Sequence, residues 1–365
     1  MIYLDHAATT PITYAARTEM EAWMSSFSCG NPNSAHTRGF QAKRAVEIAK
    51  KQIASLINAS NPDDIYFVSS GTEANTLWKE LFGLDIWVLT TKTEHSSNYT
   101  LPIRTNSAIS KLDVGKDGKV DTKRLREMDL SVFDAVSVIW VNNETGTENP
   151  IKEIGRICMD AGKVFHVDAT QAVGHVEIDV RKGHIDMMTM SAHKFGGPQG
   201  VGVLYVRGGS GNMPSRGTPN VAGIIGTGVA ALVAHERLSL RREAWKKSRE
   251  CFLEQLAKGL GDTFQVNGGN AHSSIISLTF PGVNAESLLI ALDADGLYVS
   301  ARAACATGKD EASHVLTAMG LSEDDARATI RVSMSLDQTP GEMIRAADII
   351  TNRVKKLREE GEPFV

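Results

Sequence analysis

The sequence has few cysteines, few aromatic residues and little excess charge of either sign. Its 365 residues include 6% aromatic residues, and the formal net charge is -4 at a pI of about 6.2. The near-neutral balance excludes the basic surface typical of nucleic-acid-binding proteins. The four cysteines, which form no C-x-x-C pair and so argue against a disulfide framework or a metal site, are Cys29, Cys158, Cys251 and Cys305. We therefore expect a small-molecule substrate, no metal ion and no direct contact with nucleic acid.

Long uninterrupted hydrophobic runs are also missing. The longest apolar stretch, Val221 to Ala234, is broken by Gly223, Gly226 and Gly228 and is shorter than the ~20 residues that cross a bilayer. We expect this stretch to be a buried helix rather than a membrane span. The first residues, Tyr3 to His6, lack the basic start and apolar region of an export signal, so a cytoplasmic location is the default expectation.

Short apolar runs alternate with helical patterns between about residues 64 and 206. Most of these runs are nearly continuously apolar, as strands buried on both faces should be, and the alternation is typical of a mainly parallel α/β sheet. The predicted strands are Ile65–Val68, Ile86–Thr90, Ala135–Val141, Val164–Val167, Met187–Met190 and Val201–Val206.

A different pattern follows the helical stretch Val221–Lys258. It predicts a small α+β domain with strands Ser274–Phe280, Leu297–Ser300 and Thr329–Ser333, and helices Glu286–Ala294 and Pro340–Glu359. The first residues precede the helix 15–23 and form no βα unit of the large domain. We therefore predict a large domain of residues 15–245, and a small domain formed by residues 1–14 with 246–365.

Polar residues follow several of the predicted strands, where ligands gather in parallel sheets. Thr72 opens a helix after a glycine turn and is either a plain N-cap or part of a phosphate site. Asp168 either caps a turn or lies beneath a pyridine nitrogen. Lys194, between His193 and a glycine-rich turn, is the first residue that favours chemistry, because a desolvated lysine can form a Schiff base. His95 follows another strand end.

At this point the chain resembles the cysteine desulfurases, in the class V aminotransferase group of pyridoxal-phosphate enzymes of fold-type I. The resemblance covers nearly the whole length, and the segment between Cys305 and residues 318–321 resembles the longer-loop branch of the family. The matching stretches are residues 4–11 (LDHAATTP), 30–36 (GNPNSAH), 70–75 (SGTEAN), 93–95 (TEH), 141–144 (VNNE), 166–171 (HVDATQ) and 191–194 (SAHK).

The resemblance implies a role for each matching residue around pyridoxal 5'-phosphate. Lys194 would bind the cofactor as a Schiff base, and Asp168 would pair with the pyridine nitrogen. His95 would stack on the ring and move protons. Gln171 and Asn142 would bond the side of the ring that carries the hydroxyl, and Asn142 would also contact substrate.

The resemblance further implies how the phosphate and the substrate are held. The phosphate site would consist of Gly71, Thr72, Ser191 and His193. Thr218 would reach the phosphate of a second subunit, which implies a homodimer. The remaining implied residues are Arg331, which would bind the substrate carboxylate, and Cys305, whose thiolate would attack the substrate sulfur.

The implied reaction converts L-cysteine to L-alanine and leaves a persulfide on Cys305 for a protein acceptor, in iron-sulfur cluster assembly or tRNA thiolation. The chain departs from this family in a connection shortened to residues 207–215 and in Arg302 near the cysteine. Two alternatives stay open. One is a C-S or selenocysteine lyase, or an aminotransferase, that forms no persulfide; the other is a degenerate homologue that acts as a binding partner.

Overall fold

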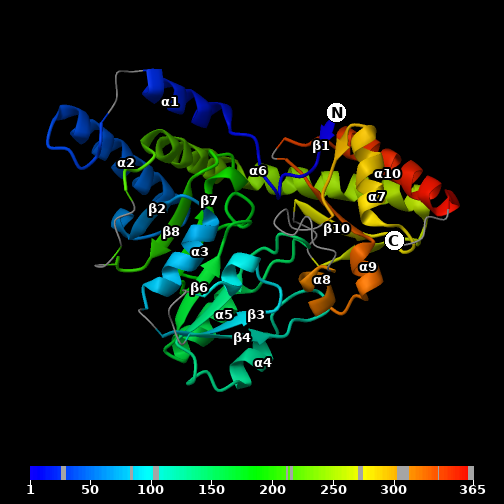
Figure 1. The fold of residues 1–365 in the computed structure, drawn as a ribbon, viewed down its shortest axis with the longest axis horizontal. Coiled ribbons are helices and arrows are strands. Elements are labelled where there is room, and N and C mark those ends of the chain that lie inside the picture. The colour runs from blue at the N-terminus through cyan, green and yellow to red at the C-terminus, as the bar shows by residue number, and fades with distance from the viewer. Residues whose placement is uncertain are drawn as a thin grey trace.

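The structure is a computed structural model that describes residues 1–25, 30–82, 85–101, 107–210, 213, 217–269, 274–301, 312–335 and 337–360. Its central feature is a mixed sheet with the strand order β2-β8-β7-β6-β5-β3-β4 (Figure 1). The strands of this sheet are β2 (Ile65–Val68), β3 (Trp87–Thr91), β4 (Ala108–Leu112), β5 (Ala135–Ile139), β6 (Val164–Asp168), β7 (Met187–Ser191) and β8 (Gly202–Val206).

The mainly parallel sheet predicted from the sequence is confirmed. All six predicted strands are present with small shifts at their ends, and β8 runs antiparallel to both of its neighbours. The edge strand β4, which pairs in parallel with β3, was not predicted. Its sequence interrupts apolar residues with Ser110 and Lys111, which is a weaker signal than the continuous apolar runs of the buried strands.

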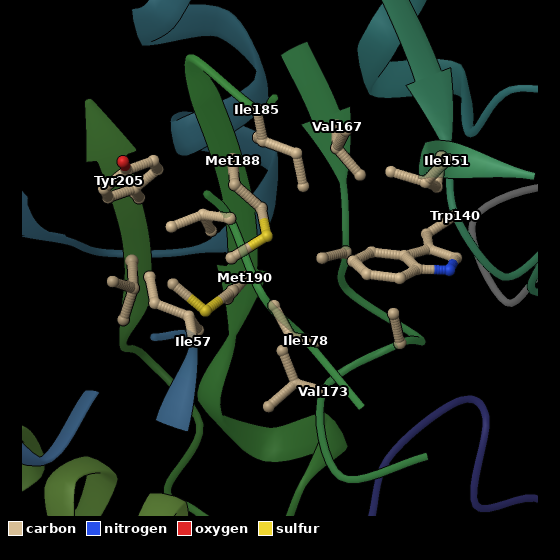
Figure 2. Packing of buried hydrophobic residues seen from close by; sticks show 14 of the residues in the cluster. Ile57, Trp140, Ile151, Val167, Val173, Ile178, Ile185, Met188, Met190 and Tyr205 are labelled. Carbon is tan, nitrogen blue, oxygen red and sulfur yellow. The ribbon is translucent and has the colours of Figure 1, made fainter. Parts of the chain in front are cut away.

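Both faces of the sheet are covered. In β8, Val203 and Tyr205 belong to one hydrophobic cluster, whereas Leu204 and Val206 belong to another on the opposite face. Figure 2 shows part of the first cluster, where Met188 of β7 lies near Tyr205. The elements around the sheet are α1 (Tyr14–Ser25), α2 (Thr37–Leu56), α3 (Gly71–Glu80), α4 (Thr122–Glu127), α5 (Ile151–Asp160), and the 3-10 turns η1 (Pro62–Asp64), η2 (Ser96–Tyr99) and η3 (Ala192–Lys194).

Helix α6 (Val221–Leu260) connects this layer to a second hydrophobic core. It packs against α1 and α2 near its start and against α10 near its end (Figure 1). Gly228 allows the close approach to α2, because a Cβ there would lie 2.9 Å from the Cα of Ala49. Among the described helices α6 alone has the length and apolar composition of a membrane span, but half of that window is buried, so we interpret it as a core helix.

The second core belongs to the C-terminal part of the chain and to its first residues. β1 (Ile2–Tyr3) pairs in parallel with β11 (Leu297–Tyr298), and Ile2 and Leu4 share a cluster with Trp245. The boundary predicted between residues 245 and 246 falls inside α6, so the domain division stays a prediction. The other elements here are β9 (Gln265–Asn267), β10 (Ile275–Thr279), α7 (Ala285–Ala294), α8 (His314–Ala318), α9 (Glu323–Arg327), β12 (Thr329–Ser333) and α10 (Pro340–Glu360).

Candidate active site

A cavity of about 210 Å³ lies at the carboxyl ends of the large sheet. It is walled by the ends of β6 and β7, by the start of α3 and by one residue of β12 from the second core. The structure therefore gathers in one place residues that are far apart in sequence. The predicted site residues that line it are Gly71, Thr72, His95, Asp168, Gln171, Ser191, His193, Lys194 and Arg331.

The start of α3 forms one end of the cavity. The N-cap of this helix is Ser70, whose hydroxyl accepts a hydrogen bond from the backbone N-H of Glu73 at 3.1 Å, so the interpretation of Thr72 as the N-cap was wrong. A Cβ at Gly71 would lie 3.1 Å from the Cβ of Ser191, a tight contact that only a small shift of Ser191 could relieve. A helix start beside a serine hydroxyl suits an anionic group such as a phosphate.

Asp168, at the end of β6, is 1% exposed. Its Oδ1 accepts a hydrogen bond from the backbone N-H of Thr170 at 2.9 Å, and Oδ2 accepts one from Asn75 Nδ2 at 2.8 Å. Asn98 Nδ2 lies 3.4 Å from the same Oδ2. Neutral donors thus satisfy the buried carboxylate without neutralising it. Asp168 therefore caps a turn, which was one of the two alternatives from the sequence, and it also lines the cavity; its position beneath a pyridine nitrogen stays a prediction.

His95 begins the turn η2 as its N-cap residue. Its Nδ1 lies 2.7 Å from Ser97 Oγ and accepts a hydrogen bond from the backbone N-H of Ser97 at 3.2 Å. Ser97 also lines the cavity and is 5% exposed. Ser97 therefore holds the His95 imidazole at Nδ1 through both its hydroxyl and its backbone N-H.

Lys194 and His193 come from η3, directly after β7. Lys194 Nζ donates hydrogen bonds to the carbonyl oxygens of Ala7 and Ala8, each at 2.6 Å. Burial, helped by the charge of Lys194, lowers the pKa of His193 to about 4, so this imidazole is neutral near pH 7. The N-terminal segment thus reaches across from the second core and contacts the candidate Schiff-base amine.

Two buried ionisable groups, Glu94 and Lys79, interact electrostatically with Asp168 of the cavity. Burial raises the pKa of Glu94 to about 8, and the nearby charge of Asp168 adds to this. Burial lowers the pKa of Lys79 to about 8, against the attraction of Glu94 and Asp168. Lys79 Nζ donates to the carbonyl oxygens of Asn75 at 2.9 Å and Thr100 at 3.1 Å, so it ties α3 to the segment that follows η2.

Among the described residues that line the cavity, Arg331 of β12 alone comes from the C-terminal part of the chain. It is 3% exposed, and its Nη2 forms an ion pair with Asp5 at 2.6 Å. Its Nη1 donates to the carbonyl oxygen of Asn143 at 2.9 Å, whereas its buried Nε has no hydrogen-bond partner within the part of the chain that the structure describes. A guanidinium in this position suits a carboxylate ligand.

Two predicted site residues are not brought into this cavity. The side chain of Asn142 bonds the carbonyl oxygen of Thr93 and the backbone N-H of Glu144, and its neighbour Asn143 lines the cavity instead. Thr218 lies in a separate groove, where its hydroxyl accepts a bond from Asn31 at 3.4 Å. Cys305, like Arg302, lies outside the described residues.

Several residues that line the cavity were not among the predicted site residues, and three of them hold predicted ones in place. Asn75 and Ser97 bond Asp168 and His95, and Asn143 offers its carbonyl oxygen to Arg331. Only Asn143 had a signal in the sequence, because it follows a predicted strand end. Asn75 lies within a helix and Ser97 within a turn, where nothing in the local pattern predicts a contact with the cavity.

Comparisons with known proteins agree with this geometry. The class-V aminotransferase family matches residues 2–214 and 208–345. A cysteine desulfurase IscS of Anaeromyxobacter sp. (strain Fw109-5) is 36% identical, over 98% of this chain and 93% of that protein. One from Dictyoglomus turgidum is 33% identical, over 98% and 95%. Among solved structures, a NifS-like protein from Rickettsia africae ESF-5 superposes with a TM-score of 0.82 at 29% identity, over 98% of this chain and 99% of that one.

The chain belongs to the class-V aminotransferase family, and within it to the cysteine desulfurases. The cofactor of this family is pyridoxal 5'-phosphate, and the fold is that of fold-type I. The residues present fit this cofactor. The start of α3 with Ser191 suits a phosphate, the buried Asp168 carboxylate suits a protonated pyridine nitrogen, and Lys194 supplies the amine.

Proposed function

We propose that this chain is a pyridoxal-phosphate-dependent cysteine desulfurase that moves sulfur from L-cysteine to Cys305 and releases L-alanine. The observation that carries the proposal is the shared cavity of Lys194, Asp168 and Arg331. A candidate Schiff-base amine, a carboxylate suited to the pyridine nitrogen and a guanidinium suited to the carboxylate of an amino acid line the same cavity, which supports the proposal. A structure titled as SspA in complex with cysteine, with a TM-score of 0.76 at 27% identity, over 92% of this chain and 99% of that one, supports an amino-acid ligand of this kind.

Each residue has a distinct task in this proposal. Lys194 binds the cofactor and then receives the α-proton of the substrate. Asp168, held by Asn75 and Thr170, keeps the pyridine nitrogen protonated. The cofactor, when bound, supplies an electron sink for negative charge at the substrate α-carbon. Arg331 binds the substrate carboxylate and so orients the carbon-sulfur bond.

The sulfur-transfer step belongs to Cys305. Its thiolate attacks the sulfur of the bound cysteine, so that a sulfur-sulfur bond forms while the carbon-sulfur bond of the substrate breaks. The electron pair of that bond and a proton pass to the β-carbon, which leaves as the methyl group of alanine. Cysteine and the Cys305 thiol therefore give alanine and a Cys305 persulfide, with no outside oxidant.

The test compares wild type with Cys305→Ser for alanine and sulfide release from L-cysteine in the presence of a thiol reductant. Cys251→Ser is the matched control, since Cys251 is a partly exposed free cysteine on α6. Loss of turnover in Cys305→Ser alone, with cofactor absorbance retained, is the expected result. Retained turnover would instead indicate a lyase, and a protein without absorbance or turnover would indicate a binding partner.

We also propose that the enzyme is a cytoplasmic homodimer that passes its persulfide to a protein acceptor in iron-sulfur cluster assembly or tRNA thiolation. The position of Thr218 supports the dimer, because this residue lies in a groove apart from the cavity of its own chain. If Thr218 contacts the phosphate of a second subunit, Thr218→Ala weakens cofactor binding without changing the KM for cysteine. Light scattering that gives a monomer mass would contradict the dimer.

A further inference from the structure

A chain of hydrogen bonds runs from Asp168 to the ring of His95, through Asn75 and Ser97. Asn75 Nδ2 lies 2.8 Å from Asp168 Oδ2 and 2.9 Å from Ser97 Oγ, and Ser97 Oγ lies 2.7 Å from His95 Nδ1. Asn75 and Ser97 are buried, and all four residues line the cavity. The direction of these bonds decides which ring nitrogen of His95 carries the proton.

The first link has only one possible direction. An aspartate carboxylate accepts hydrogen bonds and has none to donate, so the group of Asn75 that faces Asp168 must be its NH₂. Turning the amide over would place its carbonyl oxygen against the carboxylate. The second N-H of the same NH₂ then points at Ser97 Oγ, which accepts it.

The next link follows from the first. Because Ser97 Oγ already accepts the amide N-H, its own proton is available for His95 Nδ1 at 2.7 Å. The backbone N-H of Ser97 independently donates to the same Nδ1 at 3.2 Å. Two donors thus converge on Nδ1, which must offer its lone pair, so the proton of the neutral ring resides on Nε2.

We propose that Ser97 is a positioning residue that holds His95 in the neutral Nε2-H tautomer. The Asp168 carboxylate sets the direction of the hydrogen bonds that lead through Asn75 to Ser97. His95 then presents a hydrogen-bond donor at Nε2 and has no lone pair there to receive a proton. Under the proposed function, on which this step rests, His95 stabilises negative charge on the bound ligand, and removal of the α-proton falls to Lys194. The carboxylate that pairs with the cofactor nitrogen thereby also sets the state of the imidazole.

The tautomer is measured directly by proton-nitrogen NMR of the ¹⁵N-histidine-labelled holoenzyme, with the spectrum of His95→Gln identifying the His95 signal. We expect the wild type to show the Nε2-H pattern alone. A wild-type ring in the Nδ1-H form, or in a mixture of the two forms, would overturn the proposal. This readout does not depend on sulfur transfer, so it stands apart from the test of the proposed function.

Three serine variants separate positioning from simple structure. Ser97→Ala removes the hydroxyl donor at 2.7 Å and leaves only the backbone N-H at 3.2 Å on Nδ1, so we expect a mixture in which the Nδ1-H form appears beside the Nε2-H form, and kcat to fall about tenfold, as for the loss of one such hydrogen bond. Ser97→Thr keeps a hydroxyl and should restore both readouts. Ser96→Ala, on the exposed side of the same turn η2, should change neither. An unchanged tautomer together with an unchanged kcat in Ser97→Ala would count against the positioning role of the hydroxyl.

Exchange of the α-proton of L-alanine in D₂O tests the division of labour, because this exchange does not require Cys305. His95→Gln keeps an N-H donor but lacks an imidazole, and we expect exchange within about tenfold of wild type. Lys194→Ala should abolish it. Loss of exchange in His95→Gln as complete as in Lys194→Ala would show that His95 accepts the proton.

Discussion

The two sides of the cavity are held in different ways. On the side of the large sheet, neutral donors such as Asn75 hold Asp168, and Ser97 holds His95. On the other side, the Arg331 guanidinium is held by the opposite charge of Asp5. The cofactor side is therefore preorganised by neutral groups that leave its charge intact, whereas on the substrate side a carboxylate of the protein already occupies part of the guanidinium that the substrate is expected to bind.

Lys194→Ala gives the largest expected loss of activity, and the substitution changes only the cofactor side of the cavity. Without the amine, we expect kcat to fall by at least about a thousandfold, together with loss of the Schiff-base absorbance. Lys152→Ala, an exposed lysine on α5, is the control and should match wild type. Absorbance spectra and steady-state kinetics check this, and unchanged absorbance in Lys194→Ala would contradict the role of the amine.

Arg331→Lys acts on the substrate side alone. A lysine keeps the charge but loses the two-pronged geometry, so we expect kcat/KM for cysteine to fall about tenfold to a hundredfold, mainly through KM. Cofactor absorbance should be retained. Arg327→Lys, a partly exposed arginine on α9, serves as the control in the same kinetic assay. A change in cofactor affinity with an unchanged KM would mean that the two sides are not independent.

His175 links the two cores, because its half-buried ring stacks on Trp245 of α6, with the ring centroids 4.9 Å apart. Burial lowers its pKa from the usual 6.5 to about 4. The unfolded chain therefore takes up this proton first as the pH falls, and stability present above pH 6.5 is lost toward pH 4. We expect His175→Gln to make the loss of unfolding free energy between about pH 7 and about pH 5 smaller by about 2 kcal/mol.

Urea unfolding at the two pH values measures this difference. His235→Gln, an exposed histidine on the same helix α6, is the control and should leave the pH dependence as in wild type. A pH dependence that is identical in His175→Gln and wild type would mean that the His175 ring is not held neutral by its burial.

Asp5→Asn gives the smallest expected effect and tests the competition on the substrate side. The change keeps a hydrogen-bond acceptor for Arg331 but removes the negative charge, so we expect the KM for cysteine to fall about threefold, as for a partly exposed ion pair. Steady-state kinetics of this variant decide the direction. A KM that rises instead would show that Asp5 orients the guanidinium for the substrate rather than competing for it.

Much of the fold could be predicted because the buried strands carry strong local signals. The continuous apolar runs of β5, β6 and β7 predicted their positions to within two residues at each end. The edge strand β4 was not predicted, because only one side of it is paired and its sequence mixes polar with apolar residues. The N-cap of α3 was misplaced on Thr72, since Ser70 and Thr72 are both good capping residues and the glycine between them gives no local preference.

The sequence by itself determined which chemical groups stand at the strand ends, because the strand pattern and the residue types are both local properties. Only the tertiary structure decided how these groups are connected. Asp168 meets Asn75 across 93 positions, and Arg331 meets Asp5 across 326. The direction of a hydrogen bond and the partner of a buried charge depend on which donors face them from other segments, and that is settled only when the sheet, α3 and the N-terminal segment pack together.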